Sequence, residues 1–137
     1  MRVLTILSVL GLLAVVAMAG YVRLAPSDPA RWHGVPNGLE EGNGAGYALR
    51  RIEAAPDTLS AIDEIARATP RTTVLAGSVE AGMITYVTRS ALMGFPDYTT
   101  VARSEDDIVL YARLRFGQSD LGVNAARLDA WLKALAN

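Results

Sequence analysis

The fold class is indicated by the most regular run of the chain, Ile108-Val109-Leu110-Tyr111-Ala112-Arg113-Leu114-Arg115-Phe116. Every second side chain of this run is apolar from Ile108 to Phe116, and Arg113 and Arg115 fall between them. Successive side chains of a β-strand point to opposite faces of a sheet. The run therefore predicts a strand that turns one face towards a core.

Other short β-like runs precede this strand. They cover residues 47–53, 72–79, 83–90 and 98–104. The last three and the strand at 108–116 are separated only by turn-forming segments, which are Glu80-Ala81-Gly82, Gly94-Phe95-Pro96-Asp97 and Glu105-Asp106-Asp107. Connections this short join antiparallel neighbours, so the sequence predicts a meander.

Two amphipathic helices are expected around the meander. The first follows the capping residues Asp57-Thr58 and ends before Pro70, and its apolar face comprises Leu59, Ile62, Ile65 and Ala66. The second begins after Ser119-Asp120, and its apolar stripe comprises Leu121, Leu128, Trp131, Leu132 and Leu135. The predicted order is β-α-β-β-β-β-α, an α+β fold with both helices on one face of an antiparallel sheet.

The N-terminal segment is uniformly apolar. Residues 3–22 carry no charge, and as a helix they would span about 30 Å, the thickness of the hydrocarbon core of a bilayer. Arg23 ends the run where a span would meet the lipid headgroups. The alternative is a cleaved signal peptide, because Ala17-Met18-Ala19 has the small-x-small form of a cleavage site. Retention as an anchor is favoured because apolar character continues past that site to Val22.

The sequence divides into three parts. Residues 1–23 form the anchor or signal segment, residues 24–46 form a Pro/Gly-rich linker, and residues 47–137 form the α+β domain. The signal-like layout favours an N-terminus inside the cell. It predicts a single-pass protein of the cytoplasmic (inner) membrane with its domain on the periplasmic side. Cleavage near Ala19 would instead give a periplasmic protein.

The composition argues against several classes of function. The chain has 137 residues and a formal net charge of −1, so it has no basic excess for binding nucleic acid. It has no cysteine, and therefore no disulfide, thiolate nucleophile or cysteine-ligated metal. We expect no cofactor. The expected partners are the membrane, through residues 3–22, and either an envelope protein or a small anionic ligand.

Residues near the last predicted strands and helix resemble a known family. The pattern comprises Gly94-Phe95-Pro96-Asp97, Arg115-Phe116-Gly117-Gln118-Ser119-Asp120-Leu121-Gly122-Val123-Asn124 and Arg127. It resembles the bacterial domain-of-unknown-function family numbered 1499, over most of the chain from about Tyr47 onward. That family has no assigned activity, so the resemblance implies a domain but no function.

The string from Arg115 to Arg127 has two interpretations. As a joint between strand and helix, Gly117 permits a reversal of the chain and Ser119 or Asp120 caps the helix. As an anion site, the free amides at the helix N-terminus act together with a nearby arginine. Asp120 favours the joint, because its own carboxylate would occupy those amides. The candidate ligand or interaction residues of the string are Arg115, Ser119, Asp120, Asn124 and Arg127.

A second group of candidates depends on how the last two strands pair. We expect Asp97 to face Arg115 and Thr99 to face Arg113, with Arg89 near Thr99 in the next strand. The side chains that this register places on the core face are Tyr98, Ala102, Leu110 and Leu114. One sheet face would then carry Arg89, Asp97, Arg113 and Arg115. It is either a binding face for an acidic ligand or partner, or a solvated face with a cross-strand ion pair.

Residues suited to catalysis or metal binding are scarce. His33 is the only histidine and lies in the linker, which argues against a catalytic or metal-binding imidazole. Trp32 is expected to be an anchor at the membrane interface or on the domain. Glu105-Asp106-Asp107 lacks the ligand spacing of a calcium loop and favours a solvated turn.

We therefore expect a non-enzymatic binding or interaction module on the outer face of the cytoplasmic membrane. The alternatives are a small envelope enzyme acting on an anionic ligand, with no identifiable catalytic set, and a structural element of an envelope complex. An enclosed apolar pocket that holds convergent polar groups with perturbed pKa values would favour the enzyme, whereas an open sheet face would favour an interaction module.

Overall fold

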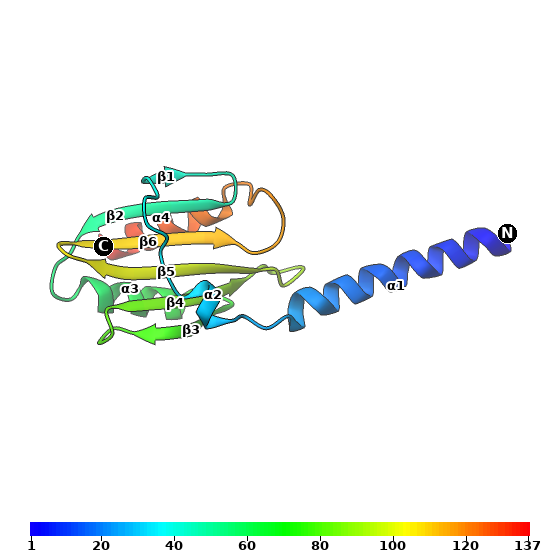
Figure 1. The fold of residues 1–137 in the computed structure, drawn as a ribbon, viewed down its shortest axis with the longest axis horizontal. Coiled ribbons are helices and arrows are strands. Elements are labelled where there is room, and N and C mark those ends of the chain that lie inside the picture. Colours follow the sequence, from blue (N-terminus) through cyan, green and yellow to red (C-terminus); the bar gives the residue numbers. More distant parts are fainter.

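The computed structural model describes the whole chain, from Met1 to Asn137. An exposed apolar helix, α1 (Arg2–Leu24), projects from one end of a domain built on a single antiparallel sheet (Figure 1). Two longer helices of the domain, α3 (Thr58–Ala68) and α4 (Val123–Leu135), lie together on one face of that sheet. The predicted α+β class is confirmed.

The sheet has six strands in the order β1-β2-β6-β5-β4-β3. Their bounds are β1 (Gly42–Asn43), β2 (Tyr47–Glu53), β3 (Thr72–Ser78), β4 (Met83–Arg89), β5 (Pro96–Ser104) and β6 (Asp107–Leu114). The four strands from β3 to β6 form the expected meander, and β2 pairs with β6 on its other side. Two short elements were not predicted, β1 and the helix α2 (Pro29–Trp32).

The main core lies between the sheet and its two helices. The helix residues in this core are Leu59, Ile62 and Ala66 of α3 and Leu128 and Trp131 of α4. Trp131 is 2% exposed, its ring meets that of Tyr86 edge-on at 5.7 Å, and its Nε1 donates to the Thr69 hydroxyl at 2.9 Å. Burial of the aromatic ring and satisfaction of its one polar atom together fix the position of α4.

The start of α4 differs from the sequence prediction. The helix begins at Val123, after Gly122 at the N-cap with a φ of 82°. Leu121 lies in the preceding turn, with a φ of 53°, and is 92% exposed. The Asp120 carboxylate accepts the Gly122 amide at 2.9 Å and closes this turn before the helix starts. Assigning Leu121 to the apolar stripe was therefore wrong.

The pairing of β5 with β6 also differs, by one residue. The turn between the two strands consists of Glu105-Asp106 alone, and Glu105 has a φ of 54°. Asp97 therefore lies opposite Leu114, and Tyr98 lies opposite Arg113. A shift of one residue moves side chains to the other face of a sheet. The residues wrongly assigned to the helix-covered face are Tyr98 and Ala102.

Candidate functional site

Residues 25–36, which we call the linker segment, cross the sheet on the face opposite α3 and α4 (Figure 1). We call this face the linker face. Trp32 stacks on Tyr98, with ring centroids 4.1 Å apart and an interplanar angle of 15°. His33 Nδ1 lies 2.9 Å from the Thr85 hydroxyl. Part of the expected connector is thus docked on the domain, and Trp32 is a docking anchor.

Three candidate arginines, Arg89, Arg113 and Arg115, hold the chain on this face. Each donates a hydrogen bond to a backbone carbonyl of the approaching chain. The acceptors are Val22 at 3.4 Å for Arg89, Trp32 for Arg113, and Pro26 at 2.9 Å for Arg115. The three arginines share one face, as the sequence predicts, but the linker segment covers part of that face. Asp97 is not on it, because of the register shift.

Arg113 is the most buried of the three, at 8% exposed. Its Nη1 donates to the Thr100 hydroxyl at 2.9 Å and to the Tyr111 carbonyl at 3.3 Å, and its guanidinium lies 4.6 Å from the centroid of the Tyr111 ring. Burial lowers the pKa of Arg113 to about 10. Arg113 has no carboxylate partner. The ion pairs of the chain are Arg50–Asp129, Arg67–Asp63 and Arg127–Asp97. Buried charges in proteins are normally paired.

A row of hydroxyls connects Arg113 with the linker segment. Thr85 and Thr100 are fully buried, and their hydroxyl oxygens lie 2.8 Å apart. Thr100 accepts from Arg113, and Thr85 contacts the His33 imidazole. The row therefore joins the linker segment, β4, β5 and β6 through side chains alone.

Gly77 makes room for the imidazole. It has a φ of 85°, close to a register shift between Val74 and Ala76 in the pairing of β3 with β4. A Cβ atom at this position would clash with the Met83 carbonyl oxygen of β4 and would lie 2.7 Å from His33 Cε1. Only glycine combines this backbone conformation with so close an approach.

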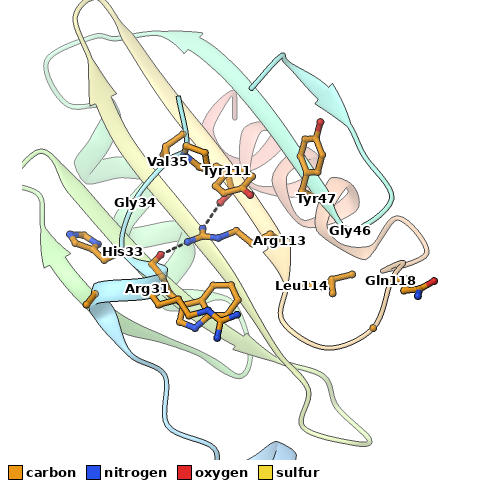
Figure 2. Close-up of a pocket in the computed structure, with 14 residues that line it drawn as sticks. Arg31, His33, Gly34, Val35, Gly46, Tyr47, Tyr111, Arg113, Leu114 and Gln118 are labelled. Carbon is orange, nitrogen blue, oxygen red and sulfur yellow. Dashed lines mark hydrogen bonds between the residues drawn. The ribbon is translucent and has the colours of Figure 1, made fainter. Parts of the chain in front are cut away.

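An open pocket of about 660 Å³ lies between the linker segment and the sheet (Figure 2). Residues 30–36 form one side, and Tyr47, Tyr111, Arg113 and Gln118 line the other. Figure 2 shows the Arg113 guanidinium between the linker backbone and Tyr111. The pocket thus combines a buried, unpaired cation with aromatic rings. Arrangements of this kind bind anions that carry a flat or apolar part.

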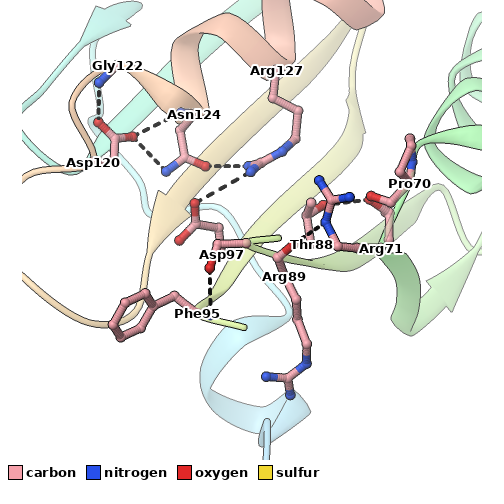
Figure 3. Close-up of polar contacts among 12 residues, drawn as sticks. Pro70, Arg71, Thr88, Arg89, Phe95, Asp97, Asp120, Gly122, Asn124 and Arg127 are labelled. Carbon is pink, nitrogen blue, oxygen red and sulfur yellow. Dashed lines mark hydrogen bonds and ion pairs between the residues drawn. The ribbon is translucent and has the colours of Figure 1, made fainter. Parts of the chain in front are cut away.

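The remaining candidates gather at a second place, at the start of α4 (Figure 3). The Asp120 carboxylate accepts from the Asn124 amide at 3.1 Å and from Asn124 Nδ2 at 2.7 Å. Arg127 Nη1 donates to Asn124 Oδ1 at 2.6 Å, and Arg127 Nη2 lies 3.5 Å from Asp97 Oδ2. Ser119 stands apart from this network, and its hydroxyl accepts from the Leu121 amide.

This network has the geometry of the joint and not of an anion site. Asp120 occupies an amide of the first turn of α4, as the joint interpretation requires. Burial alone would raise the pKa of the Asp120 carboxyl, but the hydrogen bonds from Gly122 and Asn124 outweigh burial and lower that pKa. The ionised carboxylate therefore strengthens the start of the helix.

The ion pair between Asp97 and Arg127 is poorly solvated. Their side chains are 16% and 10% exposed, respectively. Burial raises the pKa of Asp97 and lowers the pKa of Arg127, although each partner opposes the shift of the other. Desolvation thus exceeds the attraction between two charges 3.5 Å apart, which makes this pair a weak contributor to stability.

Several pocket residues were not candidates in the sequence. Tyr47 and Tyr111 look like ordinary strand residues, and His33 was placed outside the domain. The structure brings His33 onto the sheet beside a hydroxyl, an arrangement that can form a nucleophile and base. Thr85 is completely buried, however, so a substrate has no access to its hydroxyl. Trp32 was the only signal in the sequence that this segment is docked.

The fold and the site together define a class of protein, a small α+β domain carried behind an apolar N-terminal helix. The helix is long and apolar enough to cross a membrane, a property that it shares with signal sequences. A family model described as "Protein of unknown function (DUF1499)" matches residues 35–135. The chain belongs to this family, which confirms the resemblance in the sequence. The match covers all six strands and begins just after Trp32 and His33. No curated protein matches the chain.

Proposed function

We propose that this protein is a membrane-anchored, non-enzymatic binding module that takes a small anionic ligand in the pocket on the linker face. The proposal depends chiefly on Arg113, a buried guanidinium without a carboxylate partner at the wall of the largest pocket. A buried cation is costly without a counter-charge. A bound carboxylate or phosphate would supply that counter-charge.

The hydrogen bonds of Arg113 support the same ligand chemistry. A guanidinium has five N–H groups. The chain accepts two hydrogen bonds from Nη1 and one from Nη2. Nε and one N–H of Nη2 therefore remain without an acceptor. Two neighbouring donors of an arginine match the two oxygens of a carboxylate. Trp32, Tyr47 and Tyr111 would contact the apolar part of such a ligand.

Binding is favoured over catalysis by the groups available in the pocket. His33 is engaged with a buried threonine, and the pocket wall contains no aspartate or glutamate that could act with it. The alternative, an enzyme acting on an anionic ligand, would need a proton-transfer group that approaches the ligand more closely than His33 Nδ1.

Anchoring completes the proposal, with α1 retained as a single span and the domain on the periplasmic side of the inner membrane. Intact mass spectrometry tests retention, because cleavage after Ala19 would leave a species that begins at Gly20. Since the chain has no cysteine, an Asp106→Cys variant carries a single thiol in an exposed turn. A membrane-impermeant maleimide should label it in intact spheroplasts, whereas labelling only after lysis would contradict the orientation.

Ligand binding is tested with two simple anions, benzoate and inorganic phosphate. The full-length protein is placed in lipid nanodiscs, and Trp32 emission is followed during each titration in a Trp131→Phe background. We expect saturable binding of at least one anion, and a loss of about tenfold or more in affinity in Arg113→Gln, because a hydrogen bond to a charged group is removed.

The matched control for this titration is Arg51→Gln, which removes an exposed arginine outside the pocket. It should bind like the wild type. Equal affinities of the wild type and Arg113→Gln, or no saturable binding of either anion, would contradict the proposed function.

A further inference from the structure

Outside α1, the exposed large hydrophobic side chains are confined to two segments of the domain. Leu92 and Phe95 lie in the loop between β4 and β5, and Leu121 and Val123 lie where β6 leads into α4. Leu92 is 83% exposed and Leu121 is 92% exposed. Single exposed leucines are common, but a group of them at one end of a domain indicates a contact surface.

Both segments lie at the end of the domain that α1 enters (Figure 1). Arg23 Nη2 donates to the Leu92 carbonyl at 3.0 Å. The Tyr21 ring lies 6.0 Å from that of Phe116, which in turn lies 6.3 Å from Phe95. The apolar surface of the two segments therefore continues directly from that of α1.

The end of α1 leaves no flexible spacer between helix and domain. Val22 is 1% exposed, and its carbonyl accepts from Arg89. The helix continues to Leu24 before the linker segment begins. If residues 3–20 lie in the hydrocarbon core, Tyr21 and Arg23 lie at headgroup level, and the two segments are held at the same depth.

The conformation of Leu121 adds an independent observation. Its φ of 53° lies in the left-handed region, which is disfavoured for a leucine and is normally occupied by glycine or asparagine. This turn points an apolar side chain outward, where it is 92% exposed. Residues in such sparsely populated conformations are enriched at functional sites.

We infer that residues 90–95 and 119–123 lie in the headgroup region of the bilayer that α1 crosses, with Leu92 and Leu121 inserted towards the acyl chains. The inference rests on the retention of α1, which is part of the proposed function. Insertion removes the apolar side chains from water and adds two shallow contacts to the single span. It also fixes the orientation of the domain, with the sheet standing away from the membrane.

The test uses two matched alanines at opposite ends of β4. Ala91 lies in the inferred contact segment and Ala81 lies in the turn before β4, and both are exposed. Each is replaced by cysteine in the full-length protein and labelled with the environment-sensitive dye NBD. The proteins are reconstituted into vesicles of phosphatidylethanolamine and phosphatidylglycerol that contain a doxyl-labelled lipid. A Leu12→Cys variant reports on the span itself.

We expect lipid quenching to be several-fold stronger at Ala91→Cys than at Ala81→Cys, with Leu12→Cys strongly quenched. Adding Leu92→Ser and Leu121→Ser to Ala91→Cys should reduce quenching towards the Ala81→Cys level, because the inserting side chains are gone. Quenching that is unchanged by these two replacements would contradict their insertion.

Two other outcomes separate failure of the inference from failure of anchoring. If Leu12→Cys is quenched but the Ala91→Cys and Ala81→Cys labels behave alike, α1 spans the bilayer and the domain does not touch it. This outcome overturns the inference alone. Shielding of the Ala91→Cys label from aqueous iodide without lipid quenching also overturns it, and indicates a protein partner or a second copy. If Leu12→Cys is not quenched, anchoring fails and the inference fails with it.

Discussion

The two faces of the sheet are buried by different kinds of interaction. On the face covered by α3 and α4, apolar side chains pack against one another, with Trp131 among them. On the linker face, the covering chain is held by hydrogen bonds from arginines to backbone carbonyls and by one aromatic stack, Trp32 on Tyr98. Apolar packing is non-directional, whereas hydrogen bonds require particular atoms at particular distances.

This difference implies a division of roles between the two faces. The helix face supplies most of the folding free energy, because burial of apolar area is the dominant favourable contribution. The linker face contributes less and leaves an open pocket beside a buried charge. Surfaces that bind ligands are commonly built from such less stable parts of a fold.

The largest expected effect is on the helix face. Trp131→Ala should reduce the free energy of unfolding by roughly 3 to 5 kcal/mol, because it removes a fully buried aromatic side chain. Small domains have little more stability than this, so the domain should be largely unfolded. Circular dichroism during thermal melting checks the result. A normal cooperative melt would show that Trp131 does not lie in the core.

The matching change on the linker face is Trp32→Ala. It should reduce the free energy of unfolding by only about 1 to 2 kcal/mol, because the ring that it removes is half-buried and stacks on one partner, Tyr98. Denaturant melts compare it with Trp131→Ala. The domain should stay folded while the linker segment becomes accessible to protease. A loss of stability as large as that of Trp131→Ala would contradict the smaller contribution of the linker face to the folding free energy.

A smaller effect is expected at the start of α4, which belongs to the helix face. Asp120→Ala should reduce the free energy of unfolding by about 0.5 to 2 kcal/mol, because it removes the acceptor for the Asn124 amide. Asp120→Asn keeps an oxygen acceptor and should be milder. Paired denaturant melts measure both variants. Neutral or stabilising behaviour of Asp120→Ala would favour a role for this carboxylate in binding a ligand.

The smallest expected effect is a dependence of stability on pH. The pKa of Asp120 is lower in the folded chain than in the unfolded chain, so its charge stabilises the fold above the unfolded pKa. That contribution is lost as the pH falls through the folded pKa. The difference in stability between wild type and Asp120→Asn should therefore shrink below about pH 4, the ordinary pKa of an aspartate. A constant difference from pH 7 to pH 3 would contradict this role of the charge.

The helix face could be predicted from the sequence because apolar periodicity reports burial directly. The stripe containing Leu128 and Trp131 and the alternation from Ile108 onward are both present in the core. The linker face could not be predicted in the same way. Its covering segment is rich in proline and glycine and has no apolar periodicity. Every residue has a backbone carbonyl, so the sequence does not show which carbonyls accept hydrogen bonds from the arginines.

The register of β5 and β6 shows that the length of one turn decides which side chains belong to the site. The acidic turn fits either a two-residue or a three-residue loop, and the choice decides which face each side chain of β5 occupies. Glu105 adopts a left-handed conformation that only the structure reveals. In the observed register, Tyr98 lies on the linker face instead of the helix-covered face, and its ring stacks on Trp32.

The docked state of the linker segment is tested most directly by hydrogen–deuterium exchange on the full-length protein. The amides of Arg31, Trp32 and His33 are hydrogen-bonded within α2. A helix of a single turn is not stable alone, so these amides can be protected only if the segment is held on the sheet. We predict protection of peptides covering residues 29–33 in the wild type, and faster exchange there in Arg113→Met with α4 unchanged. Exchange of residues 29–33 at the rate of an unstructured chain in the wild type would contradict docking of the linker segment on the sheet.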